Sequence, residues 1–409
     1  MNKRSSLFIP FSYRDFRLAW IGFFISQIGT EMILIAINWQ IYVITKSPLS
    51  LGIIGMARFL PVLMFALFAG LFADLVNRKK LIFVSQLVLI ISTSYLAFLT
   101  FTHHINPLLI YLLVAINSTA YTFTSPARQA LLPHLVPRKH FMQAVSLNSL
   151  MWQLSVIIGP MIGGFIIGYL GIPLVYTIGV FAFMSVNITM LLLKPIPVNT
   201  NNTTFGLKSV REGLGFVKRS PLIWSTMLLD FFATFFASSM TLMPIFAKDI
   251  LNVGPQGLGI LYAAPSVGAV VAGCVFSLFH NVQRQGKILL VSVFIYGVVT
   301  IFFGFSRLFP FSLVCLTIAG ACDMISSVIR NTMRQLITPD HLRGRMTSVN
   351  MIFYLGGPQL GEVEAGVAAT LFGTPMSVVL GGIGTMVITT IMAYVVPTLR
   401  RYDNHKEIA

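Results

Sequence analysis

Apolar runs of twenty or more residues recur along the chain from about residue 18 to residue 397. A run of this length can cross the hydrocarbon core of a bilayer as an α-helix. Of the 409 residues, 56% are hydrophobic and 10% are charged, whereas a soluble protein carries roughly 25% charged residues. The sequence therefore predicts an all-α membrane protein with many spans.

We expect twelve transmembrane helices, near residues 16–44, 51–73, 81–101, 107–133, 142–168, 174–194, 220–247, 257–279, 287–305, 310–336, 343–370 and 375–397. If the N-terminus lies in the cytoplasm, most Lys and Arg residues outside these spans lie on cytoplasmic segments, as the positive-inside rule requires. This topology places both termini in the cytoplasm of a multi-pass cell-membrane protein, which is the inner membrane in a Gram-negative cell. It also accounts for the net charge of +16 without a nucleic-acid partner.

The chain contains an internal repeat. Residues 125–171, shifted by 202 positions, fall on residues 327–373 without a gap. The shift aligns Ser125 with Ser327, Arg128 with Arg330, Pro137 with Pro339, Ser146 with Ser348, Asn148 with Asn350, Gly159 with Gly361, Gly164 with Gly366 and Gly171 with Gly373. We therefore expect two six-helix bundles, 1–194 and 220–409, joined by a cytoplasmic linker at 195–219. Two such halves, related by a pseudo-twofold axis along the membrane normal, resemble the major facilitator architecture.

The segment GLFADLVNRKK at 70–80 resembles the facilitator signature between the second and third spans. Asp74 and Arg78 occupy its charged positions. The corresponding loop of the second half, at 280–287, has lost the aspartate. A carboxylate is favourable near a helix N-terminus, so Asp74 is expected to latch onto the start of the span at 343–370. The alternative is a loop charge that only sets topology.

The segment GPMIGG at 159–164 resembles the core of a motif shared by facilitator exporters. Small residues allow two helices to approach closely, and Pro160 bends its helix. Gly159 and Pro160 are therefore candidate gating residues, although ordinary helix packing explains the same pattern.

Five of the 12 acidic residues lie inside apolar spans: Glu31, Asp230, Asp323, Glu362 and Glu364. A charge at this depth costs about 2.5–3.5 kcal/mol even on the scale derived from membrane insertion. Acids kept at such positions indicate an ion or substrate pathway.

Three spans carry polar stripes at helical spacing, which are expected to face a cavity. The stripes consist of Gln27, Glu31 and Asn38, of Asn117, Tyr121, Thr124 and Arg128, and of Asp323, Ser327, Arg330 and Arg334. Polar residues that only join neighbouring helices are the alternative. Phe235 belongs to a phenylalanine cluster in the span at 220–247 that could line a substrate site or simply pack.

Glu31 is the first candidate for proton coupling because no basic residue shares its stripe and burial favours the neutral acid. Asp323 is the second candidate, since Arg330 and Arg334 on its own stripe could keep it ionised. Asp230 is expected to contact the transported molecule. A permanently protonated Glu31 is the alternative.

Arg58 is expected to pair with Glu362 or Glu364 as a gate near the outer side, because an unpaired arginine there would be costly. Residues two apart on a helix point about 200° apart, so the two glutamates cannot share one face. One of them is expected to meet a neighbouring helix and the other to face water or a different helix, and Glu364 is our candidate for the substrate cavity.

Residues 44–80, 338–350, 360–366 and 378–384 are similar to a branch of facilitator exporters that includes the enterobactin exporter and macrolide efflux proteins. The resemblance extends over nearly the whole chain. It implies alternating access, proton coupling and export of a siderophore or lipophilic drug. One departure is Pro358, where the branch has a different residue before the glutamates.

The sequence as a whole predicts a monomeric secondary exporter of an amphipathic small molecule. An importer of a similar molecule on the same fold, and a receptor that does not transport, are the alternatives. An enzyme is not expected, because no catalytic constellation or phosphate-binding loop is present. Cys274, Cys315 and Cys322 lie in apolar segments, so neither a disulfide framework nor a metal cluster is expected. We expect no cofactor either.

Overall fold

The computed structural model describes residues 6–194, 215–278, 282–339 and 342–403. Of the expected linker at 195–219, residues 195–214 lie outside the described residues. The first six long helices are α1 (Arg14–Thr45), α2 (Pro48–Leu75), α3 (Arg78–Phe101), α4 (Pro107–Leu131), α5 (Phe141–Leu170) and α6 (Ile172–Leu192). The later ones are α8 (Pro221–Phe236), α10 (Gly254–Ser277), α11 (Gln285–Phe305), α12 (Phe309–Ile337), α13 (Arg343–Phe372) and α14 (Thr374–Val395).

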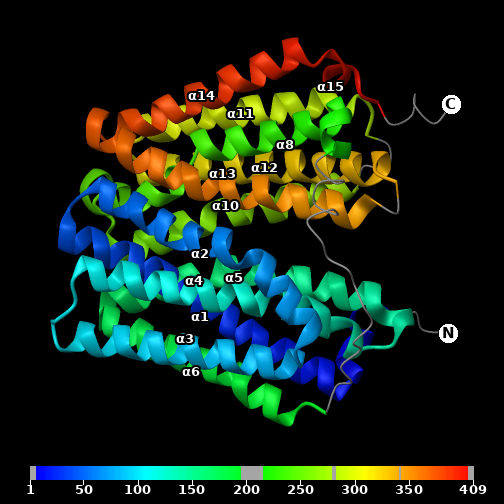
Figure 1. Ribbon diagram of the computed structural model, residues 1–409. Coiled ribbons are helices and arrows are strands. Elements are labelled where there is room, and N and C mark those ends of the chain that lie inside the picture. Colours follow the sequence, from blue (N-terminus) through cyan, green and yellow to red (C-terminus); the bar gives the residue numbers. More distant parts are fainter. Residues whose placement is uncertain (1–5, 195–214, 279–281, 340–341, 404–409) are drawn as a thin grey trace. The chain divides into compact units, whose positions relative to one another are not determined.

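Short helices connect or flank the long ones (Figure 1). They are η1 (Ser6–Ser12), η2 (Leu132–His134), η3 (Arg138–His140), η4 (Ser239–Leu242), α9 (Met243–Ile245), the π-helix η5 (Phe246–Ile250) and α15 (Pro397–Arg401). Within the described residues the fold is entirely helical, which confirms the predicted fold class.

The chain divides into two compact units. Unit 1 comprises Met1–Lys46, Ala57–Thr203 and Gly254–Ile260, and unit 2 comprises Ser47–Met56, Thr204–Val253 and Leu261–Ala409. The first turns of α2 thus belong to unit 2, and the first turns of α10 belong to unit 1. The expected division at 195–219 stays a prediction.

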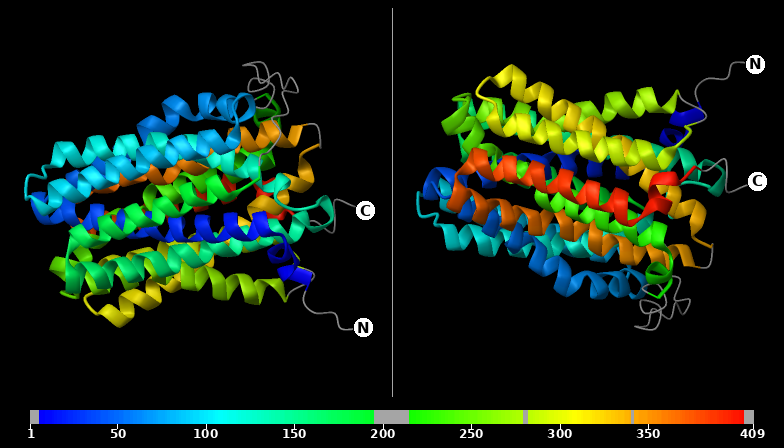
Figure 2. Two further views of the ribbon diagram at one scale, coloured as in Figure 1. Left: turned by 90° about the horizontal axis from the view of Figure 1, so that it is seen from below. Right: turned by 90° about the horizontal axis from the view of Figure 1, so that it is seen from above.

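The two units use the same set of helix neighbours (Figures 1 and 2). In unit 1, α1 packs against α5 and α6, and α3 packs against α4 and α6. In unit 2, α8 packs against α13 and α14, and α11 packs against α12 and α14. Each pair in unit 1 therefore has a counterpart in unit 2, as the internal repeat predicts.

The repeat is most regular at α5 and α13. Both helices have 30 residues, and their bounds are separated by the 202 positions of the repeat. α5 ends at Gly171, with φ 89° and ψ 165°, and α13 ends at Gly373, with φ 85° and ψ 152°. A glycine adopts a positive φ without the steric cost that a Cβ would bring, which explains why the repeat retains glycine at this position.

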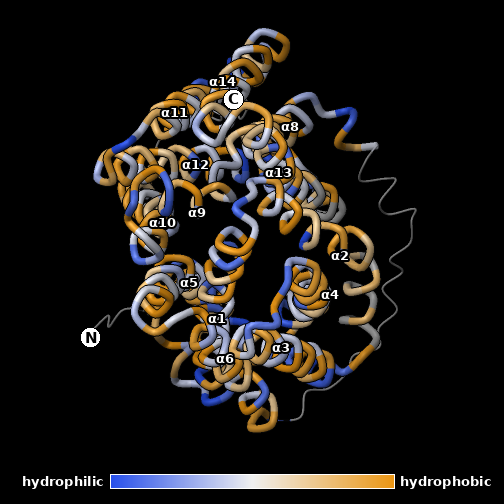
Figure 3. The backbone as a smooth tube through the Cα atoms, turned by 90° about the vertical axis from the view of Figure 1, so that its left-hand side faces the viewer, coloured by the Kyte–Doolittle hydropathy of each residue, from blue (hydrophilic) through white to orange (hydrophobic). Residues whose placement is uncertain are grey.

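Eleven helices of the described residues are long and apolar enough to cross a membrane. Hydrophobic residues dominate along the helices, as Figure 3 shows. The remaining long helix is α13, which corresponds to the expected span at 343–370. Its polar residues Gln359, Glu362 and Glu364 lower its hydropathy.

The span expected at 220–247 is interrupted. α8 ends at Phe236, and the chain continues through η4, α9 and the π-helix η5 to Ile250. At the interruption the backbone N–H of Ser239 donates to the carbonyl of Ala237 over 2.8 Å. The side chain of Ser238 donates to the carbonyl of Pro358 on α13 over 3.3 Å. Side-chain bonds of this kind satisfy backbone groups that a broken helix leaves open.

Candidate functional site: a charged cluster in unit 2

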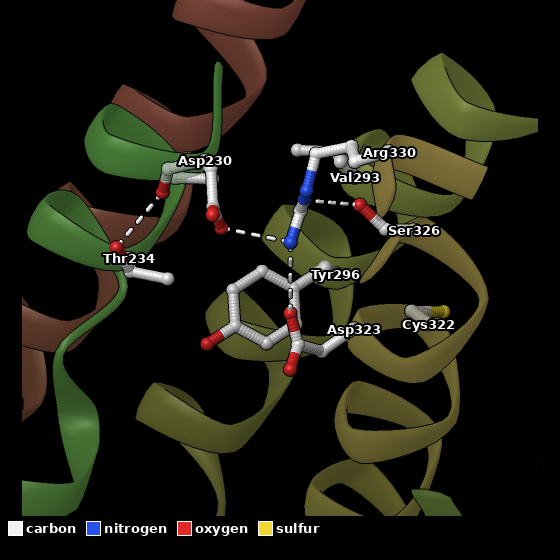
Figure 4. A pocket seen from close by; sticks show the side chains of 9 residues that line it. Asp230, Thr234, Val293, Tyr296, Cys322, Asp323, Ser326 and Arg330 are labelled. Carbon is white, nitrogen blue, oxygen red and sulfur yellow. Dashed lines mark hydrogen bonds and ion pairs between the residues drawn. The ribbon is translucent and has the colours of Figure 1, made fainter. Parts of the chain in front are cut away.

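Three charged side chains of unit 2 meet inside the bundle (Figure 4). Nη2 of Arg330 on α12 lies 2.7 Å from Oδ1 of Asp230 on α8 and 3.8 Å from Oδ1 of Asp323 on α12. The sequence places Asp323 and Arg330 on one stripe of α12, seven residues apart, which is about two helical turns. The helix neighbours of α12 then bring Asp230 to the same guanidinium.

Hydroxyl groups hold the arginine in place. Arg330 donates to the hydroxyl of Ser326, and its Nη2 donates to the hydroxyl of Ser327 over 3.0 Å. On α8, the hydroxyl of Thr234 donates to the carbonyl of Asp230 over 2.8 Å. The serine hydroxyls thus hold the guanidinium on α12, and its ion pair with Asp230 joins α8 to α12.

The two carboxylates differ in exposure. The side chains of Arg330 and Asp230 are 3% and 6% exposed, whereas the side chain of Asp323 is 54% exposed. The buried pair is neutral as a whole, so an ionised Asp323 adds one net negative charge. Proton uptake by Asp323 would remove that charge.

A small pocket lies beside the cluster. It is lined by Asp230, Ala233, Thr234, Val293, Tyr296, Cys322, Asp323, Ser326 and Arg330. Its volume of about 10 Å³ is at the lower limit for one water molecule. The pocket can therefore hold a water beside the carboxylates, and it is too small for an amphipathic cargo.

Arg334, the other basic residue of the α12 stripe, is directed elsewhere. It donates to the amide oxygen of Asn350 on α13 and, over 2.7 Å, to the amide oxygen of Asn331. Among the described residues, Asp323 therefore pairs with Arg330 and not with Arg334. The periodicity of α12 alone could not show which of the two arginines pairs with Asp323, because their partners on α8 and α13 decide where each guanidinium points.

In unit 1, Glu31 lies on α1 beside Gln27. Nε2 of Gln27 donates to Oε1 of Glu31 over 3.0 Å. A Cβ placed on Gly159 of α5 would lie 2.5 Å from the Cβ of Glu31. The glycine of the exporter-like motif therefore lets α5 approach α1 at the height of the half-buried Glu31.

Glycines also mediate the packing of α10 and α2. In unit 1, Gly259 of α10 packs on the carbonyl of Pro160. In unit 2, a Cβ on Gly52 of α2 would lie 3.3 Å from the Cα of Gly366. A Cβ on Gly55 would lie 2.6 Å from Oε2 of Glu362. Glu362 thus faces the first turns of α2.

The remaining cavity candidates lie on different helices. Asn38 is buried, Asn117 accepts a hydrogen bond from Ser92, and Tyr121 is 37% exposed. Phe235 stacks on Phe231 with ring centroids 6.0 Å apart. This stacking is ordinary packing within α8. The roles of all these residues in cargo binding stay predictions.

The gating candidates are only partly described. Nη1 of Arg78 donates to the carbonyl of Ala130 over 3.2 Å and to the ring of His134, which joins the start of α3 to the end of α4 and η2. The side chains of Asp74 and of residues 343–345 lie outside what the structure describes. The latch between them stays a prediction, as do the pairing of Arg58 and the role of the half-buried Glu364.

Tyr296 on α11 was missed by sequence reasoning. It lines the pocket, and its hydroxyl lies 3.5 Å from the carbonyl of Ala237 at the end of α8. The sequence signal that could have found it is a single tyrosine in the apolar helix Gln285–Phe305. A buried tyrosine hydroxyl usually has a hydrogen-bond partner, so such a residue indicates a polar site.

The family model that matches this chain and the similar proteins show a multi-pass membrane transporter of the major facilitator superfamily that handles a small molecule. More narrowly, the chain belongs to the family described as transmembrane secretion effector, whose model matches residues 5–409. The chain is thereby placed among transporters and not among enzymes.

Two similar proteins are named enterobactin exporter EntS. The one from Shigella boydii serotype 18 (strain CDC 3083-94 / BS512) is 27% identical over 409 residues, with 98% of this chain and 97% of that protein covered. The one from Escherichia coli O1:K1 / APEC is 26% identical with the same coverage.

Two solved structures share the fold. One is a bacterial homologue of the human lysosomal transporter Spinster, in an inward-facing and unoccupied conformation, with a TM-score of 0.78, 14% identity, and 98% of this chain and 100% of that chain covered. The other is the nucleoside transporter NupG, with a TM-score of 0.76, 12% identity, and 95% and 100% covered. At such low identity the likeness shows the fold alone.

Proposed function

We propose that the chain is a proton-coupled secondary exporter that moves an amphipathic small molecule out of the cytoplasm by alternating access. The observation that carries the coupling is the position of Arg330 between a buried and an exposed carboxylate. The protein acts as a monomer in the cell membrane with both termini in the cytoplasm. The distribution of Lys and Arg supports this orientation.

The names of the similar proteins support a siderophore of the enterobactin kind as cargo. Lipophilic drugs are the wider class that the sequence resemblance implies. The cargo site lies outside the small pocket of unit 2, because that pocket is too small to hold it. Two helices of unit 1 supply candidate contacts for such a molecule. On α1 these are Gln27 and Asn38, and on α4 they are Asn117 and Tyr121.

In the proposed cycle, Asp323 carries the proton. When Asp323 is ionised, two carboxylates attract Arg330. Asp230 attracts it towards α8, and Asp323 attracts it towards its own helix, α12. When Asp323 is protonated, the neutral Asp230–Arg330 pair remains and the second attraction is lost. Coulomb attraction is strong in a low-dielectric interior, so one proton changes how firmly α12 holds the guanidinium.

Glu31 is the second proton carrier in this proposal. It accepts a hydrogen bond from Gln27, and it lies where α5 closely approaches α1. A change in its protonation would alter this contact. The geometry of Asp323, with an arginine 3.8 Å away and a side chain that is more exposed than that of Asp230, makes Asp323 the stronger of the two candidates.

Inverted membrane vesicles test direction and coupling together. With an acidic lumen, we expect enterobactin to accumulate inside vesicles that contain the wild-type protein and to leave when the gradient is collapsed. The Asp323→Asn variant should not accumulate it. Asp15→Asn, a change in the first turn of α1 outside the cluster, is the matched control and should behave as wild type. Accumulation by Asp323→Asn at the wild-type rate would contradict the proposed coupling.

A further inference from the structure

A second arginine lies inside unit 1 at the position that the repeat equates with Arg330. This residue is Arg128 on α4. Its Nη2 donates to Oδ1 of Asn148 over 3.3 Å and contacts the sulfur of Met151 at 3.5 Å. Its guanidinium carbon lies 4.3 Å from the centre of the Phe23 ring. All three neighbours are uncharged.

The two arginines differ in what the neighbouring helix offers them. α8 presents Asp230 to Arg330, whereas its counterpart α1 presents the Phe23 ring to Arg128. In the part of the chain that the structure describes, no carboxylate pairs with Arg128. A cation–π contact stabilises a cation, but by less than the cost of removing the charge from water.

Donors remain available on this guanidinium. The hydrogen bonds of Arg128 within the described residues use Nη2 alone. Nε and Nη1 are left to bind another group. The N–H groups of these nitrogens are charged donors, and such donors form strong hydrogen bonds with carboxylate oxygens.

Arg128 lies on the path expected for cargo. It is three residues before the end of α4 at Leu131, which the proposed topology places on the cytoplasmic side, where an exported molecule enters. The contacting residue Phe23 shares a face of α1 with Gln27 and Glu31, because these residues follow at a spacing of four. Glu31 is eight residues beyond Phe23, about 12 Å along the helix.

We propose that Arg128 forms an anion-binding subsite of unit 1 that receives a negatively charged oxygen group of the cargo, such as a carboxylate. The cargo anion supplies for Arg128 the partner that Asp230 supplies for Arg330. This proposal rests on the proposed export function and narrows its substrate class to amphipathic acids.

The test uses the full-length protein purified in detergent, with 2-naphthoate as the acidic probe and uncharged 2-naphthamide as its shape-matched control. A ligand that binds the folded state raises the melting temperature. We expect 2-naphthoate to raise the melting temperature of the wild type more than 2-naphthamide does. The difference should vanish in Arg128→Gln and be reduced in Arg128→Lys, which keeps the charge and loses the planar fork.

Two further variants complete the test. Arg138→Gln removes an exposed basic residue of η3 and should leave the naphthoate shift unchanged, which excludes general attraction to a basic surface. Phe23→Asp places a carboxylate of the protein against Arg128. This carboxylate should pair with the guanidinium in place of the probe and so abolish the naphthoate shift. An equal shift with both probes, or a naphthoate shift that persists in folded Arg128→Gln, overturns the subsite.

The vesicle experiment separates this proposal from the export function. If proton-driven export fails in the wild type while the naphthoate shift depends on Arg128, the subsite stands and the transport proposal is wrong. If export succeeds and the naphthoate shift is absent, the subsite is wrong and the export function stands.

Discussion

Arg330 donates to Asp230 across 2.7 Å, and this buried ion pair joins α12 to α8. Both side chains are nearly inaccessible, at 3% and 6% exposure. Two opposite charges that are removed from solvent together compensate each other, while the loss of one leaves the other unpaired. The pair therefore has a structural role that is separable from the proton-carrying role proposed for Asp323.

Replacing Asp230 by Asn should destabilise the protein. Breaking a buried pair costs about 3–5 kcal/mol, and we expect the low end of that range because Asp323 is near enough to compensate part of the charge of Arg330. Thermal unfolding in detergent measures the effect. The double variant Asp230→Asn/Arg330→Gln should recover part of the lost stability. Additive losses in the double variant would show that the two side chains do not depend on each other.

Replacing Asp323 by Asn should leave the melting temperature within a few degrees of wild type, because the exposed side chain takes no part in the buried pair. Proton movement, followed by a pH-sensitive dye in proteoliposomes during cargo addition, should be lost. A large fall in melting temperature would instead assign Asp323 a structural role.

Glu31→Gln imitates the neutral acid and preserves the hydrogen-bonding shape of the side chain. We expect proton-driven export to be lost while cargo binding, measured by thermal shift, is largely kept. Asn38→Ala, on the same stripe of α1, is the comparison, since it removes a polar group without touching a titratable one. Export that responds to pH as in wild type would remove Glu31 from the mechanism.

Gly159→Ala should destabilise unit 1, because the new Cβ would lie 2.5 Å from the Cβ of Glu31. Overpacking of this kind costs about 1–3 kcal/mol. Gly215→Ala is the matched control, since a Cβ there meets no atom within 4 Å. Equal melting temperatures for the two variants would show that α5 can move away from α1 at no cost.

The sequence predicted the repeat and the helix positions well because both depend on local chemistry. Apolar runs, prolines near helix starts and the glycines at 171 and 373 fix where α5 and α13 begin and end. The interruption after Phe236 was not predicted. It depends on partners such as the carbonyl of Pro358 on another helix, which the local sequence does not reveal.

The charged cluster was predicted in part. Helical spacing placed Asp323 and Arg330 on one stripe, since both lie on the same helix. It could not assign Asp230 to Arg330, because that contact depends on how α8 packs beside α12. Asp230 was expected to touch cargo, and its burial against Arg330 leaves little of its carboxylate exposed for that role.

The most direct measurement of the central claim is enterobactin accumulation in inverted vesicles at a fixed acidic lumen, comparing wild type with Asp323→Asn. We predict gradient-driven accumulation by the wild type and none by the variant, with equal amounts of folded protein in both membranes. Accumulation by Asp323→Asn that still collapses with the pH gradient would contradict the claim that this carboxylate carries the proton.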